Sequence, residues 1–153
     1  MSTFERGSEW RRWDLHVHTK SSYDAYKGDD ADEVLCQALM DNEIAAVAIT
    51  DHFLIDSKRI ENLRKLAPTI TFFPGVELRC DKGASNMHVV IIFSDKINLK
   101  ELETDFSSIM YGDKAKSKGD DETVYWDFDD IKEFANKRNG LIAVHAGIKE
   151  NGL

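Results

Sequence analysis

The feature that most constrains the fold is a set of short, nearly unbroken apolar runs. They lie at 45–50, 87–93 and 141–145. Such runs are typical of strands that are buried on both faces, as in parallel sheets. Two more segments are β-rich: 69–76, and 13–18, in which apolar residues alternate with other residues. The sequence therefore predicts a sheet built from these segments.

Helical patterns separate the predicted strands. We predict helices at 31–42, 57–66, 99–110 and 128–138. Asp30 and Ser57 are expected to cap the first two helices, and Asn139 and Gly140 to end the last. The charged, glycine-containing segment 111–123 is expected to be a mobile loop. Alternating strands and helices predict an α/β fold with a mainly parallel sheet or barrel.

The composition excludes several classes of protein. A chain of 153 residues with 42% hydrophobic residues can bury the core of one domain. The net charge of −8 argues against a broad basic surface for nucleic acid. There is no apolar run of the roughly 18 residues that a membrane span needs, and the polar lead-in at 1–12 has no signal core. With Cys36 and Cys80 expected to be free thiols, these features predict a cytoplasmic protein.

All five histidines fall at the ends of predicted strands. His16 and His18 end the first strand, and His52 follows the second. His145 ends the last strand, and Glu77 ends the third. Because the carboxyl ends of parallel strands meet at one edge of a sheet, these side chains are expected to converge.

His88 is the exception, because it begins its strand. A hairpin through 81–86 would make that strand antiparallel to the one before it and would return His88 to the same edge. His16 and His18 are expected to point to one side, because side chains alternate along a strand. With that reversal, all five imidazoles would lie within reach of one site.

The residue types at this edge are metal ligands. Imidazole and carboxylate together suit zinc, iron or manganese. Glu77 could bridge two ions, Asp24 lies in a loop able to fold over the site, and Asp51 could orient a ligand. A lone histidine is usually an ordinary core or surface residue, but burying so many titratable groups without a cation would be costly. Glycine-rich phosphate loops, GxSxG and HExxH are absent from the sequence, which disfavours other hydrolytic chemistries.

The motifs that carry these residues resemble, in order, those of the PHP (polymerase and histidinol phosphatase) superfamily. They are Asp14-Leu15-His16-Val17-His18-Thr19 with Ser22 and Asp24, Ile49-Thr50-Asp51-His52, Pro74-Gly75-Val76-Glu77, His88-Val89-Val90-Ile91-Ile92-Phe93 and Ala143-Val144-His145. The resemblance implies a PHP domain over 13–153, with the distorted seven-stranded β/α barrel of that superfamily. It also implies up to three divalent ions (zinc, manganese or iron) and hydrolysis of phosphomonoesters or phosphodiesters by a metal-bound water.

The resemblance further implies a role for each ligand. It assigns three metal sites: His16, His18 and Glu77; Glu77, His88 and His145; and Asp24 with His52. Arg79 lies two residues beyond Glu77 and is a candidate for binding a substrate phosphate, the alternative being an ordinary salt bridge. Asp51, which precedes His52, is expected to assist catalysis as an outer partner that orients a metal ligand.

The sequence departs from the superfamily at one point, because the last motif, an Asp-x-His, has no counterpart in the 153 residues. We therefore expect an incomplete barrel, truncated on its C-terminal side, with an exposed edge for self-association. The opening RGSEWRRWDLHVHT resembles a subgroup in which the PHP domain heads a longer chain with an ABC/SMC-like ATPase region. The expected substrate is a phosphorylated small molecule or nucleic acid. Two alternatives stay open, a catalytically weak module that regulates or scaffolds the ATPase and a nuclease module.

Overall fold

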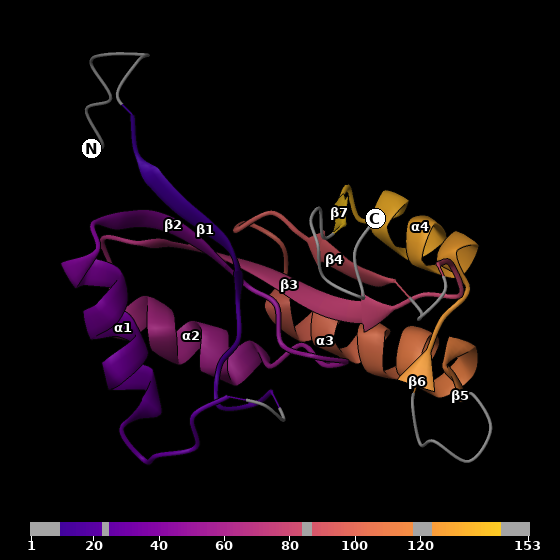
Figure 1. Ribbon diagram of the computed structural model, residues 1–153, viewed down its shortest axis with the longest axis horizontal. Helices are drawn as coiled ribbons and strands as arrows, with labels where there is room; N and C mark the ends of the chain where they lie inside the picture. The colour runs from indigo at the N-terminus through magenta and orange to yellow at the C-terminus, as the bar shows by residue number, and fades with distance from the viewer. Residues whose placement is uncertain (1–9, 23–24, 84–86, 118–123, 145–153) are drawn as a thin grey trace.

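The main sheet has five strands in the order β1-β2-β3-β4-β7 (Figure 1). The computed structural model describes residues 10–22, 25–83, 87–117 and 124–144. The strands are β1 Arg12–Val17, β2 Ile44–Ile49, β3 Thr71–Arg79, β4 His88–Ile92 and β7 Leu141–Val144. Each of the five predicted strands is therefore confirmed, with small shifts at its ends.

Strand direction decides where the strand ends meet. β1, β2 and β3 are mutually parallel, β4 is antiparallel to β3, and β7 is antiparallel to β4. In this five-stranded sheet only β4 is therefore reversed, and Arg79 of β3 pairs with His88 of β4. The predicted parallel direction of the first three strands is confirmed, and the fourth strand has the reversal that His88 needs to reach the same edge.

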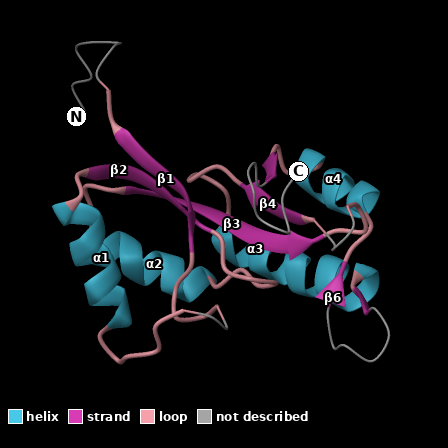
Figure 2. Ribbon diagram, in the orientation of Figure 1, coloured by secondary structure: helices cyan, strands magenta, loops and turns pink. Residues whose placement is uncertain are grey.

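The helices share one apolar core with the sheet, and Figure 2 shows the first three of them along one side of it. They are α1 Ala31–Asp41, α2 Ser57–Leu66, α3 Leu99–Asp105 and α4 Phe128–Asn136, and α3 continues into the π-helix η1 Phe106–Lys114. Leu63 of α2 and Phe134 of α4 share one apolar core with Val47 and Ile91 of the sheet. Burying a side chain such as Leu63 stabilises the fold by about 1.5–3 kcal/mol.

The helix caps differ from the prediction. The N-cap of α2 is Asp56, whose side chain accepts a hydrogen bond from the Arg59 backbone N–H at 3.0 Å. Ser57 instead donates its hydroxyl to Glu103 at 2.6 Å, which ties α2 to α3. Asp30 stands at the predicted N-cap of α1, but its side chain makes no capping bond. Tyr26 donates its hydroxyl to the Asp30 carboxylate at 3.0 Å.

The predicted loop at 111–123 is wrong in its first part. Helical structure runs on through Lys114, and β5 (Lys116–Ser117) then pairs antiparallel with β6 (Val124–Tyr125), while 118–123 lie outside the described residues. Trp126 is fully buried and donates from its indole nitrogen to the Met110 carbonyl at 2.8 Å. This tertiary packing outweighs the low helix propensity of Gly112 and the local charges.

A bulge in β1 decides which way its histidines face. Trp13 pairs with Ala46 and Val17 pairs with Ile49, with a register shift between Asp14 and Val17. Ala46 and Ile49 lie on opposite faces of β2, and so their partners Trp13 and Val17 lie on opposite faces of β1. Without the shift, Trp13 and Val17 would lie on the same face, because they are four residues apart. Val17 packs against the core under the helices. Its neighbours His16 and His18 are thereby turned to the other face, the usual effect of a bulge near a site.

Part of the face of the sheet without helices is apolar. Ala48, Val90 and Ile92 form a second buried cluster there, with Phe73 packed against it. The ring of Phe73 also contacts that of Trp13, with centroids 6.1 Å apart.

No helix in the described part of the chain has the length and apolar character required to cross a bilayer.

Candidate metal centre

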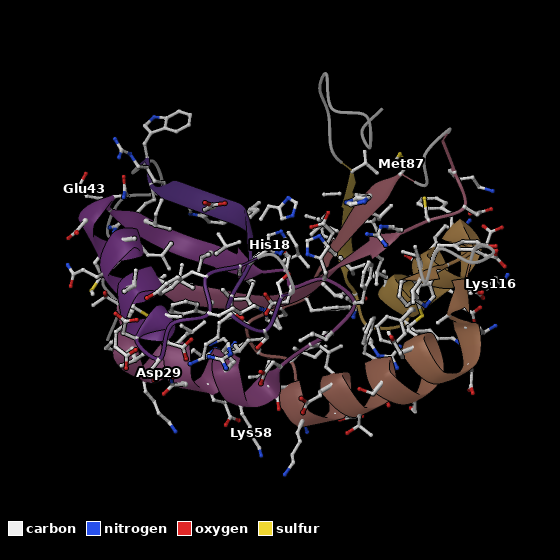
Figure 3. All side chains as sticks on the ribbon, turned by 60° about the horizontal axis from the view of Figure 1, so that its bottom comes forward. His18, Asp29, Glu43, Lys58, Met87 and Lys116 are labelled. Atoms are coloured by element: carbon white, nitrogen blue, oxygen red, sulfur yellow. The ribbon has the colours of Figure 1, made fainter. Side chains whose placement is uncertain are left out.

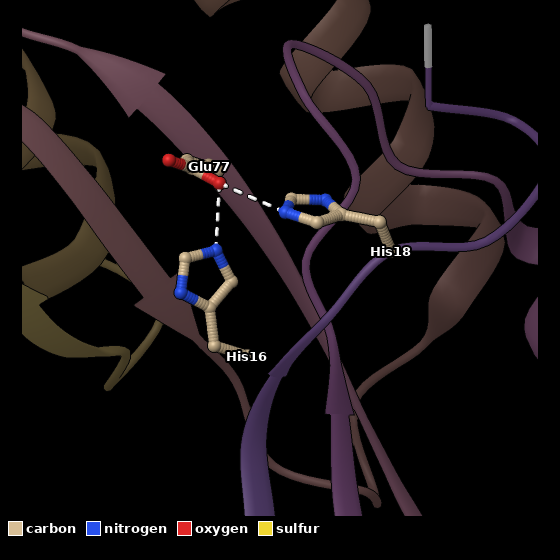
Figure 4. A group of neighbouring side chains, drawn as sticks. All are labelled: His16, His18 and Glu77. Carbon is tan, nitrogen blue, oxygen red and sulfur yellow. Dashed lines mark hydrogen bonds and ion pairs between the residues drawn. The ribbon is translucent and has the colours of Figure 1, made fainter. Parts of the chain in front are cut away.

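Four histidines surround the carboxylate of Glu77, which is only 2% exposed. Oε2 of Glu77 lies 2.7 Å from His16 Nε2, 3.2 Å from His18 Nε2 and 3.4 Å from His52 Nε2. Oε1 of Glu77 lies 2.6 Å from His88 Nδ1. Figure 4 shows His16 and His18 approaching the same oxygen of Glu77. The two rings point to one side, as strand alternation predicted.

Backbone pairing brings these residues to one level of the sheet. Thr50 donates its N–H to the Val17 carbonyl at 2.8 Å, so β1 and β2 stay together past the end of β2. Beyond the end of β2, the backbone N–H of Glu77 donates to the Asp51 carbonyl at 3.1 Å. The Glu77 carbonyl accepts a hydrogen bond from the backbone N–H of Phe53 at 3.0 Å. These bonds place His52 beside Glu77 in an isolated bridge.

The reversed strand supplies the fourth histidine. His88 begins β4 and pairs with Arg79 at the end of β3. This end of β4 therefore lies at the carboxyl ends of β1, β2 and β3. The neighbouring Val89 packs in the core shared with the helices, so the side chain of His88 faces the other side of the sheet. Figure 3 shows His18 well away from Lys58 of α2, which projects outward from the helix layer.

The electrostatics of Glu77 depend on its neighbours. Burial raises the pKa of Glu77, but hydrogen bonds from His16, His18 and His88 outweigh burial and hold the pKa far below its usual range. The group is therefore a carboxylate at neutral pH. The rings of His18 and His52 stack beside this carboxylate, with centroids 4.4 Å apart and planes 10° apart. Neutral imidazoles around one carboxylate are what a divalent cation requires.

The donor atoms fall into two overlapping sets of metal-ligand type. His16, His18 and Glu77 form one set, and His52, Glu77 and His88 form the other, with ligand atoms within 4.8 Å of one another. Imidazole nitrogens with a carboxylate oxygen fit zinc, iron or manganese. Glu77 belongs to both sets, and the residues present fit a divalent cation.

The structure brings together five of the seven predicted ligands. Asp24 and His145 lie outside the described residues. β7 ends at Val144, which pairs with Val89, the neighbour of His88. The predicted third site, which paired His52 with Asp24, stays a prediction. Within the described residues, His52 is instead grouped with Glu77 and His88.

Asp51 acts on the chain that follows His18. Its carboxylate accepts hydrogen bonds from the Thr19 backbone N–H at 2.6 Å and from the Thr19 hydroxyl at 2.7 Å. Burial raises the pKa of Asp51, and the two bonds from Thr19 partly oppose this rise. Asp51 therefore fixes the residue next to a candidate ligand through Thr19.

Two contacts around His52 were not predicted. The hydroxyl of Ser22 lies 2.7 Å from His52 Nδ1. The ring of Phe53 stands edge-on to the ring of His52, with centroids 5.7 Å apart. The signal available for Ser22 was its position four residues past His18, in the loop that leaves the same edge of the sheet.

Arg79 extends the site along β3. It lies two residues beyond Glu77, and so on the same face of the strand. Its guanidinium lies 4.9 Å from the centroid of the Phe53 ring. Phe53 has a φ of 60°, which is uncommon for a bulky residue. Such backbone strain persists only where the surrounding structure enforces it. The strained backbone holds an aromatic ring between a candidate ligand, His52, and the candidate phosphate-binding Arg79.

Comparison with known proteins identifies the fold. No family model and no curated protein sequence matches the chain. Among solved structures, an amidohydrolase from Chromobacterium violaceum aligns over 86% of this chain and 66% of its own, with 16% identity and a TM-score of 0.56. A protein from Bifidobacterium adolescentis, whose description proposes a metal-dependent phosphoesterase, aligns over 90% and 68%, with 14% identity and a TM-score of 0.60.

The chain thus spans about two thirds of the length of each of these structures. At 14–16% sequence identity, the similarity to these two structures is a similarity of fold alone. It agrees with the curled, mixed five-stranded sheet and its single helix layer. The chain has a barrel-like α/β fold, in which the described strands form part of a barrel.

Proposed function

We propose that this chain carries a metal-dependent phosphoesterase centre of the PHP type. The observation that carries the proposal is the carboxylate of Glu77, which is buried and faces four imidazole nitrogens at 2.6–3.4 Å. Ordinary cores do not assemble such a group, because burying many titratable side chains without a cation is costly.

In this proposal each residue has a defined task. His16 and His18 would hold one cation, His52 and His88 would hold a second, and Glu77 would serve both groups. Divalent cations supply Lewis acidity toward phosphate oxygens and lower the pKa of a coordinated water. Asp24 and His145 remain proposed additional ligands on the basis of their motifs.

Arg79 is the proposed anchor for the substrate phosphate. A guanidinium presents several N–H donors in a planar fork that matches phosphate oxygens. The ring of Phe53 supports its flat face at 4.9 Å, and this restricts the orientation of the fork. Asp51 and Thr19 hold the chain beside His18 and so keep the first pair of imidazoles in place.

The comparisons support the proposal at a coarse level. The description of one structural neighbour proposes a metal-dependent phosphoesterase, and the other neighbour, an amidohydrolase, holds sulfate, which is a tetrahedral anion like phosphate. Assignment to the PHP superfamily, an attached ATPase region and a cytoplasmic location are proposed from the sequence motifs and composition. The choice among zinc, manganese and iron is part of the same proposal.

Hydrolysis of chromogenic esters tests the function. The protein is stripped with a chelator, reloaded with Mn²⁺ or Zn²⁺, and assayed with bis-p-nitrophenyl phosphate and p-nitrophenyl phosphate. We expect turnover that requires metal and is lost in Glu77→Gln. Turnover that persists in the chelator would contradict the proposal, and so would turnover of a p-nitroanilide amide in place of both esters.

Metal content separates the enzyme from the non-catalytic module. After gentle purification the proposed centre should retain close to stoichiometric metal, measured by plasma emission spectroscopy. A wild-type chain that is folded but holds only traces of metal after reloading would support the regulatory or scaffolding module.

A further inference from the structure

The hydroxyl of Ser22 is buried against a candidate metal ligand. Ser22 is fully buried, and its Oγ lies 2.7 Å from Nδ1 of His52, which is itself 6% exposed. The other ring nitrogen of His52, Nε2, lies 3.4 Å from Oε2 of Glu77. Ser22 therefore contacts the side of the ring that faces away from the carboxylate.

A closed set of hydrogen bonds places that hydroxyl. Ser22 donates its backbone N–H to the Thr19 carbonyl at 3.0 Å, which makes a tight turn just after His18. Thr19 is held by Asp51 through both its N–H and its hydroxyl, and Asp51 directly precedes His52. Asp51 and His52, which follow β2, thus bind the two ends of one turn, Thr19 and Ser22. We call this turn the Thr19–Ser22 brace.

The brace also receives support from outside. Lys27 donates to the Ser22 carbonyl, and Arg59 donates from Nε to the hydroxyl of Ser21 at 2.8 Å. The Ser21 hydroxyl in turn donates to Asp56 at 2.8 Å, at the start of α2. The turn is therefore held to the helix layer as well as to β2, and Ser22 has little freedom to move away from His52.

A hydroxyl suits this position because it can both donate and accept. When Nε2 of His52 carries the proton and faces Glu77, Ser22 donates to Nδ1. When Nε2 is bare, as a metal ligand must be, Nδ1 carries the proton and donates to Ser22. The ring is neutral in both forms, so the contact between Ser22 and His52 persists in each. A carboxylate in place of Ser22 could serve only the second form.

We propose that Ser22 is a positioning residue for the metal centre: its hydroxyl holds the ring of His52 through Nδ1 and so keeps Nε2 directed at Glu77. The inference rests on the metal centre proposed above. Outer partners of this kind fix the orientation of a ligating imidazole, and their loss costs about 10–100-fold in metal affinity. Ser22 is distinct from Asp51, which reaches the brace from its other end.

Zinc affinity of full-length variants, measured by competition with a chromogenic chelator, tests the role. Ser22→Ala should bind Zn²⁺ about 10–100-fold more weakly than wild type. Ser22→Thr, which retains the hydroxyl, should recover most of that loss. Ser107→Ala, an exposed serine on η1, is the matched control and should bind as wild type does.

Spectroscopy supplies a readout that a merely structural role would not move. The visible absorption bands of bound Co²⁺ report ligand geometry, and they should shift in Ser22→Ala but not in Ser22→Thr. In the metal-free protein, the ¹⁵N resonances of the His52 ring should shift in Ser22→Ala as well. Thermal unfolding confirms that each variant is folded.

A second variant keeps the test decisive if Ser22→Ala does not fold. Thr19→Val keeps the shape of the side chain and removes its hydroxyl bond to Asp51, so it should weaken zinc binding in the same direction by a smaller factor. Wild-type zinc affinity with an unchanged Co²⁺ spectrum in Ser22→Ala would overturn the inference. Zinc binding without ester hydrolysis in the wild type would sink the proposed function and leave the role of Ser22 standing.

Discussion

Nδ1 of His88 lies 2.6 Å from Oε1 of Glu77, across two antiparallel strands. His16 and His18 face the other oxygen, Oε2, and both do so through Nε2. The two oxygens of one carboxylate therefore face histidines from different parts of the sheet. His52 also faces Oε2, through Nε2 at 3.4 Å, although it is grouped with His88, so Glu77 as a whole, and not one oxygen for each set, is the member that the two ligand sets share.

Replacing Glu77 by glutamine should remove both ions. The change keeps the shape of the side chain but abolishes the negative charge that would offset the charge of the bound cations. We expect the bound metal per chain to fall to traces and ester hydrolysis to fall with it. Glu61→Gln, at an exposed position on α2, is the matched control. Retention of full metal content in the Glu77 variant, measured by plasma emission spectroscopy, would refute the bridging role.

Single histidine variants should separate the two ligand sets. His16→Ala removes one donor of the first set, and His88→Ala removes one donor of the second. Each should lower the metal content by about one ion per chain, because three protein ligands are the usual minimum for a site that keeps its ion. The double variant should resemble Glu77→Gln. Loss of all metal from each single variant would instead indicate one indivisible cluster.

Arg79 should govern substrate binding and leave metal binding intact. Arg79→Lys keeps the charge but loses the planar fork and its support on Phe53, so KM should rise with a smaller change in kcat. Losing a hydrogen bond to a charged group costs about 1.5–3 kcal/mol, so Arg79→Ala should raise KM roughly 10- to 100-fold. Lys82→Ala, on the adjacent hairpin and largely exposed, is the control. An unchanged KM in Arg79→Ala would assign Arg79 to packing.

Gly75 should tolerate no side chain. A Cβ there would lie 2.7 Å from the Ile91 carbonyl oxygen and 2.9 Å from Cγ2 of Thr50. Gly75→Ala should lower the free energy of unfolding by about 1–3 kcal/mol, as overpacked positions do. Gly112→Ala, where the nearest atom is the Ser107 carbonyl oxygen at 3.3 Å, should be close to neutral. Urea denaturation of both variants checks the difference.

The two cysteines should report on folding. Cys36 and Cys80 are free and buried, and burial is the largest cause of the raised pKa of each thiol. We expect both thiols to react slowly with a disulfide reagent at pH 8 in the native protein, because the thiolate is the reactive form. Both should react at once in denaturant. Rapid labelling of either thiol under native conditions would show that its surroundings open.

Local patterns predicted most of the fold. The helix at 57–66 and the antiparallel return of His88 were both visible, because apolar periodicity and strand ends are local features. The continuation of η1 beyond Met110 to Lys114 was not predicted, because it depends on Trp126, which is distant in sequence and donates to Met110. Long-range packing of this kind overrides local propensity.

The site shows the same limit. His16, His18, His52, Glu77 and His88 could be brought together by reasoning from strand ends alone. The bulge between Asp14 and Val17 could not, although it sets the facing of His16, because a register shift depends on pairing with β2. The contact from Ser22 to His52 was also hidden, since it joins two loops across 30 residues. Whether Asp24 and His145 join the centre stays a prediction.

The separation of the ligands along the chain has a consequence for folding. His16 and Glu77 are 61 residues apart, so a growing chain exposes its first two imidazoles long before the shared carboxylate is made. Closing so long a loop is entropically costly, and contacts of this range form late. The centre is therefore completed only when β3 and β4 have joined the sheet. An ion bound there would stabilise the completed sheet. It would slow unfolding far more than it would speed folding, because its ligands come together late.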